Sequence, residues 1–150
     1  MTKIEFLQAV QKGRDDWDER LKGIDPSGTE QAPVPGKMSL RDLLYHIAWY
    51  EREMVSVCQL RSLVGSPWWN LPTDERNVYI MEEGQGVSLL EAYHQERLVY
   101  SVLLAQLQTL SDEELEDASF FKEMPPDWKP WQVIASNTYE HYTEHLADLA

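Results

Sequence analysis

The chain has 150 residues, with 26 acidic and 13 basic side chains and a formal net charge of -13 at pH 7. This length is enough for one domain with an apolar core of its own, and we predict a single domain over residues 1–150. The negative charge repels phosphate groups, so nucleic acids and anionic membrane surfaces are disfavoured as partners.

The composition also bears on the compartment. Cys58 is the only cysteine, which excludes an internal disulfide and fits a reducing environment. We expect it to be a small buried apolar residue. No apolar run approaches the ~20 residues that span a membrane, and the N-terminus lacks the pattern of a signal peptide. The sequence therefore predicts a soluble cytoplasmic protein.

The first helix is predicted to begin after Thr2, because Thr2 and Glu5 form a capping-box pattern. Arg14 interrupts its apolar face. We expect the charged end of Arg14 to reach solvent from a core-facing stem, with anchoring of a substrate as the alternative. Residues 25–28 end the helix, and a loop containing Pro and Gly runs to about Met38. The apolar face recurs at three- and four-residue steps: Leu7, Val10, Trp17, Leu21 and Ile24.

Two further long helices follow. Ser39 and Asp42 form a second capping-box pattern, which opens a helix that ends near residues 65–67. Ser88 opens the next helix, which carries leucines as far as Leu110. Both segments carry apolar residues at helical spacing, so each is predicted to pack one face against a core.

The remaining segments are connections and a last helix. Residues 66 to about 87 are predicted to be a long connection. Ser111 caps a short acidic helix, and prolines precede a continuous last helix that runs from Pro130 to Leu149. No internal repeat and no alternating strand pattern occurs. The predicted fold class is all-α, a four-helix bundle with a long crossover between the second and third helices.

A histidine pair marks the last predicted helix. His141 and His145 are four residues apart, so both imidazoles lie on one face and can reach a single metal ion. The same face carries Ile134 and Leu149, which predicts that it faces the core. The alternative is a pair without a metal, in which the histidines are merely core polar groups.

The position of His46 along its helix indicates how it could be the third ligand of the metal ion. His46 lies roughly 10 Å along the second helix, whereas the histidine pair lies roughly 16 to 22 Å along the last one. Only an antiparallel pairing of these helices brings the three imidazoles to one level. The third helix must then run parallel to the second, after a crossover of roughly 36 Å. About eleven extended residues cover that span, so residues 66–87 are long enough.

Three neutral imidazoles leave one tetrahedral position open, as in catalytic rather than structural zinc sites. Zinc, nickel and iron(II) all accept imidazole, so the ligands do not select the ion. Each ligating ring is expected to donate its other N–H to an acceptor. The candidate acceptors by sequence distance are Glu53, Glu144 and Asp148.

Several aromatic residues are candidates for the wall of a pocket. Trp49 and Tyr50 follow His46 closely on the second helix. The tryptophans of the connections, Trp68, Trp69 and Trp128, are expected either at a pocket mouth or at a dimer contact, with simple cover of the bundle end as the alternative. His94 is expected at a partly buried or rim position and not as a metal ligand.

These motifs resemble the DinB superfamily and, more narrowly, its branch of colibactin self-resistance (ClbS/DfsB-like) proteins. The most specific parts are His46 with the nearby Trp49, and the final pattern Asn137-Thr-x-x-His-x-x-x-His145. The likeness covers nearly the whole chain. It is carried by residues 1–7, 39–46, 74–77, 110–115 and 131–145.

The resemblance implies a bundle with a crossover between its second and third helices, often as a homodimer, and a divalent metal on His46, His141 and His145. Superfamily members include S-transferases in which the metal activates a low-molecular-weight thiol. The narrower branch includes hydrolases that disarm electrophilic metabolites.

Three hypotheses follow. The first is a metal-dependent enzyme, a thiol S-transferase or a hydrolase, that acts on a small and electrophilic molecule. The second is a protein that binds and sequesters a small toxic ligand without turnover. The third is a structural or interaction protein. The partner in the first two is a small molecule.

Overall fold

The computed structural model describes residues 1–24 and 38–149, and within them it has no β-strand. The loop predicted from residue 25 to about Met38 therefore falls almost wholly outside the described residues. None of the helices described is both long and apolar enough to span a membrane. The helices are α1 (Lys3–Lys22), α2 (Leu40–Leu60), α3 (Thr73–Glu83), α4 (Leu89–Leu107), α5 (Asp112–Glu116), α6 (Pro130–Ser136) and α7 (Tyr139–His145), with 3-10 turns at Pro67–Asn70, Gly84–Gly86, Ala118–Phe120 and Leu146–Leu149.

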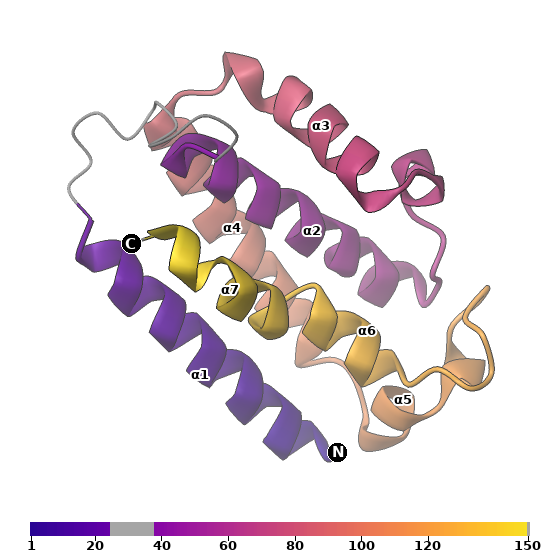
Figure 1. Cartoon of the computed structure of the whole chain (residues 1–150). Helices are drawn as coiled ribbons and strands as arrows, with labels where there is room; N and C mark the ends of the chain where they lie inside the picture. The colour runs from indigo at the N-terminus through magenta and orange to yellow at the C-terminus, as the bar shows by residue number, and fades with distance from the viewer. Residues whose placement is uncertain (25–37, 150) are drawn as a thin grey trace.

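The long helices run up, down, down and up (Figure 1). Helices α2 and α4 are parallel, and α3 returns the chain between them across the outside of the bundle. Helix α1 and the α6–α7 segment run in the opposite direction to α2. The predicted all-α bundle with a crossover is confirmed.

The predicted connection contains a helix that was not predicted, over Thr73–Glu83. Its buried residues are Arg76 and Ile80, and Ile80 packs against the buried aromatic side chains of α2. Val78 and Tyr79 are roughly half exposed. These exposed apolar side chains blur the helical period that would have identified the segment as amphipathic.

Capping residues begin the helices largely as the sequence predicts. The Thr2 and Glu5 capping box is complete, with both reciprocal hydrogen bonds present. At the start of α2 only half of the box forms, since the Ser39 hydroxyl accepts from the Asp42 N–H while the Asp42 carboxylate accepts from Arg41. Aspartate is one methylene shorter than the glutamate of a capping box, which explains the missing reciprocal bond.

The last helix is not continuous. Helix α6 ends at Ser136, and Thr138 has φ -130° and ψ -104°, which lie outside the helical region. The Thr138 hydroxyl donates to the Ile134 carbonyl at 2.8 Å, and the Asn137 amide donates to the Val133 carbonyl at 2.8 Å. Side chains that bond back to the preceding turn bend helices and compete with the backbone ladder. This break sets the direction of α7.

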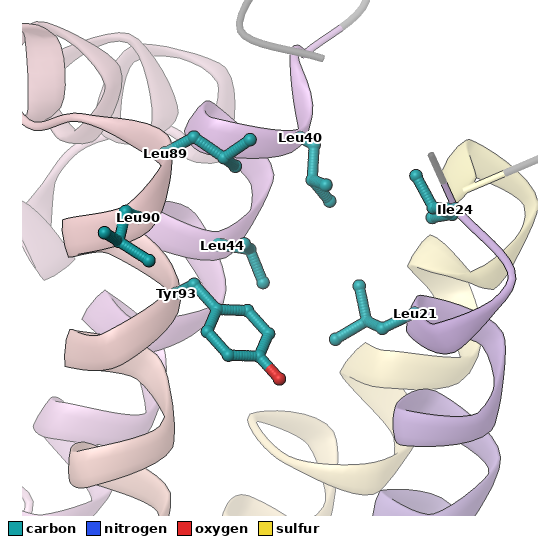
Figure 2. A pocket seen from close by; sticks show the side chains of 7 residues that line it. All are labelled: Leu21, Ile24, Leu40, Leu44, Leu89, Leu90 and Tyr93. Carbon is teal, nitrogen blue, oxygen red and sulfur yellow. The ribbon is translucent and has the colours of Figure 1, made fainter. Parts of the chain in front are cut away.

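An apolar pocket of about 310 Å³ lies at one end of the bundle (Figure 2). Side chains of α2 and α4 face Leu21 and Ile24 across it, and the Tyr93 hydroxyl points into the opening. Leu44 lies about 200° around α2 from His46, so this pocket is on another face of that helix. The remaining lining residues are Leu40, Leu89 and Leu90.

Helix α7 packs very closely against α1 at Gly13. A Cβ at this position would lie 2.4 Å from the Cβ of Tyr139, much closer than real Cβ contacts allow. We expect Gly13→Ala to lower the free energy of unfolding by about 1–3 kcal/mol through overpacking, as measured by urea denaturation. Gly23→Ala is the matched control, because its Cβ would be 3.6 Å from the nearest atom. Equal stability of the two variants would contradict this close contact.

Candidate metal centre

Three histidine side chains meet between α2 and α7. His46 comes from α2, and His141 and His145 come from successive turns of α7. The Nε2 of His141 lies 3.0 Å from the Nε2 of His46 and 3.1 Å from the Nε2 of His145. The antiparallel pairing of α2 with the last segment thus brings together the three predicted ligand candidates. Among the described residues, no other group of His, Cys, Asp or Glu has such a geometry.

The chemistry of these nitrogens fits a cation better than hydrogen bonds. A neutral imidazole Nε2 carries either one proton or one lone pair. The Nε2 of His141 therefore cannot bond well to both of its neighbours at once. In a tetrahedral zinc site with Zn–N of 2.0–2.1 Å, neighbouring ligand nitrogens are about 3.3–3.4 Å apart. The observed separations are slightly shorter, so a small outward shift would admit a divalent ion.

Burial keeps two of the rings neutral. It lowers the pKa of His46 from its ordinary value to about 2, with a further contribution from the neighbouring His141 and His145. Burial also lowers the pKa of His141 to about 3, with His145 as the second cause. Only the neutral imidazole has a lone pair for a metal. Both rings are therefore in the form that binds a metal at neutral pH.

The candidate acceptors beside the ligands divide into one that contacts a histidine and two that do not. The Nδ1 of His145 lies 2.7 Å from the Asp148 carboxylate, which orients the ring with Nε2 toward the other two histidines. Glu53 instead accepts hydrogen bonds from the backbone of Ser66 and the indole of Trp69, and Glu144 is exposed. The buried Nδ1 of His141 has no hydrogen-bond partner in the described part of the chain.

Tyr50 forms one wall of the site. Its ring centroid is 4.9 Å from that of His46 and 4.8 Å from that of His141. The hydroxyl donates to the Asn77 side chain at 2.7 Å and accepts from Arg76 at 3.2 Å. Helix α3 thereby fixes the ring against the histidines. No role was predicted for Arg76 or Asn77, although both lie in the motif over residues 74–77.

Trp49 belongs to a set of stacked rings next to this wall. It is buried, and its ring lies 5.9 Å from Trp68 and 5.5 Å from Trp69 between centroids. The Arg76 guanidinium lies 4.5 Å from the Trp69 ring centroid, a cation–π distance. Trp68 and Trp69 therefore pack against α2 and α3, and they close the side of the bundle beside the histidines.

Arg14 is buried, so the expectation that its charged end reaches solvent is wrong. Its guanidinium forms a two-pronged ion pair with Glu96 of α4, one bond of which is 2.8 Å. Glu51 of α2 lies 3.7 Å away and accepts a 2.7 Å hydrogen bond from the Tyr142 hydroxyl. Glu51 and Tyr142 were not predicted as site residues, because each lies on a helix face that is otherwise apolar. The arginine stabilises the core behind the site and contacts none of the three histidines.

Two other residues have simpler surroundings. Cys58 is fully buried, as predicted, and burial raises the pKa of its thiol to about 12. His94 is exposed, which excludes the partly buried alternative but not the rim position, and it lies outside the histidine cluster. It lies on the outer face of α4, where Leu90 and Leu98 are also exposed, so the flanking leucines gave a misleading signal of burial.

Family comparison supports the same assignment as the motifs. The family model of the DinB superfamily matches residues 9–149. The chain belongs to the DinB superfamily. No curated protein matches the sequence significantly.

Solved structures show the same fold at low sequence identity. An uncharacterised protein from Escherichia coli UTI89 has a TM-score of 0.79 and 18% identity over 99% of this chain and 90% of that one. DfsB, described as a sibling lethal factor precursor, has a TM-score of 0.77 and 20% identity over 99% and 93%. A Streptococcus pneumoniae protein has a TM-score of 0.78 and 17% identity over 99% and 88%.

The lowered histidine pKa values predict a pH dependence of stability in chelator-treated protein. The unfolded chain takes up protons at His46 and His141 as the pH falls below about 6.5, whereas the folded chain does not. The free energy of unfolding should therefore fall with pH, by at most about 1.4 kcal/mol per unit for each histidine. Between about pH 6.5 and 5, His46→Gln should show a shallower slope in urea denaturation, and His94→Gln the unchanged slope. Parallel slopes for all three proteins would show that burial does not hold these rings neutral.

Removal of Arg14 should have a large effect. Arg14→Met leaves Glu51 and Glu96 buried without their cation, and we expect a loss of about 3–5 kcal/mol in unfolding free energy. Arg97→Met is the control, because Arg97 forms a partly exposed pair with Asp18 at 3.2 Å that contributes at most about 1 kcal/mol. Adding Glu96→Gln to Arg14→Met should recover part of the loss. Similar midpoints for the two single variants would contradict a core role for Arg14.

Proposed function

We propose that this protein binds one divalent metal ion at His46, His141 and His145 and acts with it on a small electrophilic molecule. The observation that carries the proposal is the convergence of three imidazole nitrogens from α2 and α7, with His141 Nε2 close to both of its neighbours. Zinc, nickel and iron(II) all suit imidazole ligands. Membership of a superfamily that includes metal-binding members supports the same proposal.

A bound ion would supply Lewis acidity, lowering the pKa of a water or thiol in its open position. The chain's own residues prepare that position. Burial keeps two ligands neutral, and Asp148 holds His145 in place. Tyr50 places an apolar ring beside the rings of His46 and His141. Because its proton is donated to Asn77, Tyr50 supports the site as a wall rather than as a free acid.

Two reactions suit such a site. In thiol transfer, the sulfur of a low-molecular-weight thiol forms a bond to the electrophilic carbon, and the leaving group takes up the thiol proton. In hydrolysis, water provides both the nucleophilic oxygen and the proton. We propose the enzyme reaction without choosing between these nucleophiles.

Non-catalytic sequestration of a small toxic molecule is the second candidate function. It is favoured by a cavity of about 480 Å³ whose lining includes Trp69 and Trp128, a volume within the range of ligand sites. A homodimer and a cytoplasmic location remain predictions.

Metal content tests the proposal. Natively purified protein, or protein incubated with zinc or nickel and then desalted, should hold about one ion per chain by elemental analysis. His46→Ala and His141→Ala should lose it, because two imidazoles hold a tetrahedral ion weakly. His94→Ala should retain it. A wild-type protein that holds no more metal than His46→Ala would refute the metal site.

An epoxide probe separates the candidate reactions. Metal-loaded protein incubated with styrene oxide and a small thiol yields a thioether by thiol transfer or a diol by hydrolysis, both resolved by liquid chromatography. Either product should form faster than without protein, and the acceleration should disappear in His46→Ala. Formation of neither product above background, together with metal-independent binding of the epoxide, would favour sequestration.

A further inference from the structure

A cavity of about 480 Å³ lies further along α2 than His46, between α2, the segment after it, and α6. Trp128 borders it and is 46% exposed, which places this indole at the mouth. The complete lining is Glu53, Met54, Val57, Leu63, Gly65, Trp69, Trp128, Val133, Ser136 and Asn137.

The cavity begins on the face of α2 that also carries His46. Glu53 follows His46 by seven residues, two turns or about 10 Å along α2. Asn137 precedes His141 by four residues in the antiparallel segment. Helix α2 therefore leads from His46 to the cavity, and the other chain segment reaches the cavity at Asn137, just before the break that precedes α7. Glu53 and Asn137 form the polar end of the cavity, and each is the lining residue of its own segment that is closest in sequence to a histidine. Trp128 is further from the histidines in sequence.

The two polar groups at that end present hydrogen-bond acceptors. Glu53 is held by one oxygen, Oε1, which accepts from the Ser66 backbone and the Trp69 indole, each at 2.9 Å. Its second oxygen accepts no hydrogen bond from any described residue. Asn137 uses its amide N–H on the Val133 carbonyl at 2.8 Å, and its side-chain oxygen likewise has no described donor. These two oxygens are therefore free to accept a hydrogen bond from a ligand.

Charge favours one type of ligand. Glu53 is the only ionisable side chain among the lining residues, and none of them is basic. The rest of the lining is mainly aliphatic and aromatic. An apolar body fits such walls, and an ammonium or another N–H group would supply the donors that the two free oxygens lack. An anionic ligand would meet Glu53 without a compensating cation.

We propose that this cavity binds the non-reacting part of the substrate, which is an extended small molecule with an apolar or aromatic body and an amine near its reactive end. The body lies between Trp69 and Trp128, and the amine donates to Glu53 and Asn137. The orientation of the reactive end toward the histidines rests on the proposed function. Binding in the cavity does not require a metal.

Two probes that differ in charge test this assignment. Phenylbutylamine and phenylbutyrate share one ring and one chain, and each can be titrated against the tryptophan fluorescence and by calorimetry. We expect the amine to bind at least about tenfold more tightly than the carboxylate, since a charged hydrogen bond is lost in the latter. Equal affinities, or no binding of the amine, would overturn the proposal.

Variants locate the bound probe. Glu53→Gln keeps the oxygen that Ser66 and Trp69 use but removes the charge, so it should weaken amine binding about tenfold. Glu144→Gln is the matched control, because this exposed carboxylate lies outside the cavity. Trp128→Ala should weaken both probes. Thermal unfolding checks that each variant is folded, and unchanged amine affinity in Glu53→Gln would place the amine elsewhere.

His46→Ala separates this proposal from the metal proposal. Amine binding that persists in this variant, with a wild-type protein that holds no metal, would leave the cavity assignment standing and refute the metal site. A wild-type protein that binds metal but not the amine would refute the cavity assignment alone.

Discussion

A buried polar network joins the four main helices, and the geometry of the histidine site depends on it. Arg14 of α1 pairs with Glu96 of α4, Glu51 of α2 lies next to the guanidinium, and Tyr142 of α7 donates to Glu51. Burying such groups costs free energy unless each has its partner. A slip of any one helix by a turn would leave a charge unpaired in the core. Because Tyr142 follows His141 directly, the arrangement that brings these groups together also sets the level of α7 against α2.

The level of the three histidines was predictable because it depends on chain length and helix rise. Spacing on α7 placed His141 with His145, and the length of the connection allowed α4 to run parallel to α2. The buried arginine was not predictable in the same way. A single Arg in an apolar stripe gives no sign of its acid partners, which lie on two other helices. Arg14 meets Glu51 and Glu96 only after the bundle has formed.

Local structure near the site was also harder to predict, for two physical reasons. The break between α6 and α7 arises from side chains that bond back to the helix, such as Thr138 to the Ile134 carbonyl. Threonine also occurs within helices that continue past it, so its presence alone does not indicate a break. Helix α3 buries little besides Arg76 and Ile80, and its pattern is therefore weak. Yet α3 fixes Tyr50 through Asn77 and Arg76, so the connection that seemed only to span a distance also completes the wall of the site.

One face of α2 carries His46 at the candidate metal centre and Glu53 in the lining of the cavity. Sequence distance made Glu53 a candidate acceptor for a histidine N–H, but it is two turns from His46 and bonds to Trp69 and Ser66 instead. Asp148, three residues after His145, contacts that ring within a single turn. A carboxylate one turn away from an imidazole can orient it. A carboxylate two turns away on the same face is about 10 Å further along the helix and cannot reach the ring. The helical rise therefore places Asp148 beside a ligand ring and Glu53 two turns away, in the lining of the cavity.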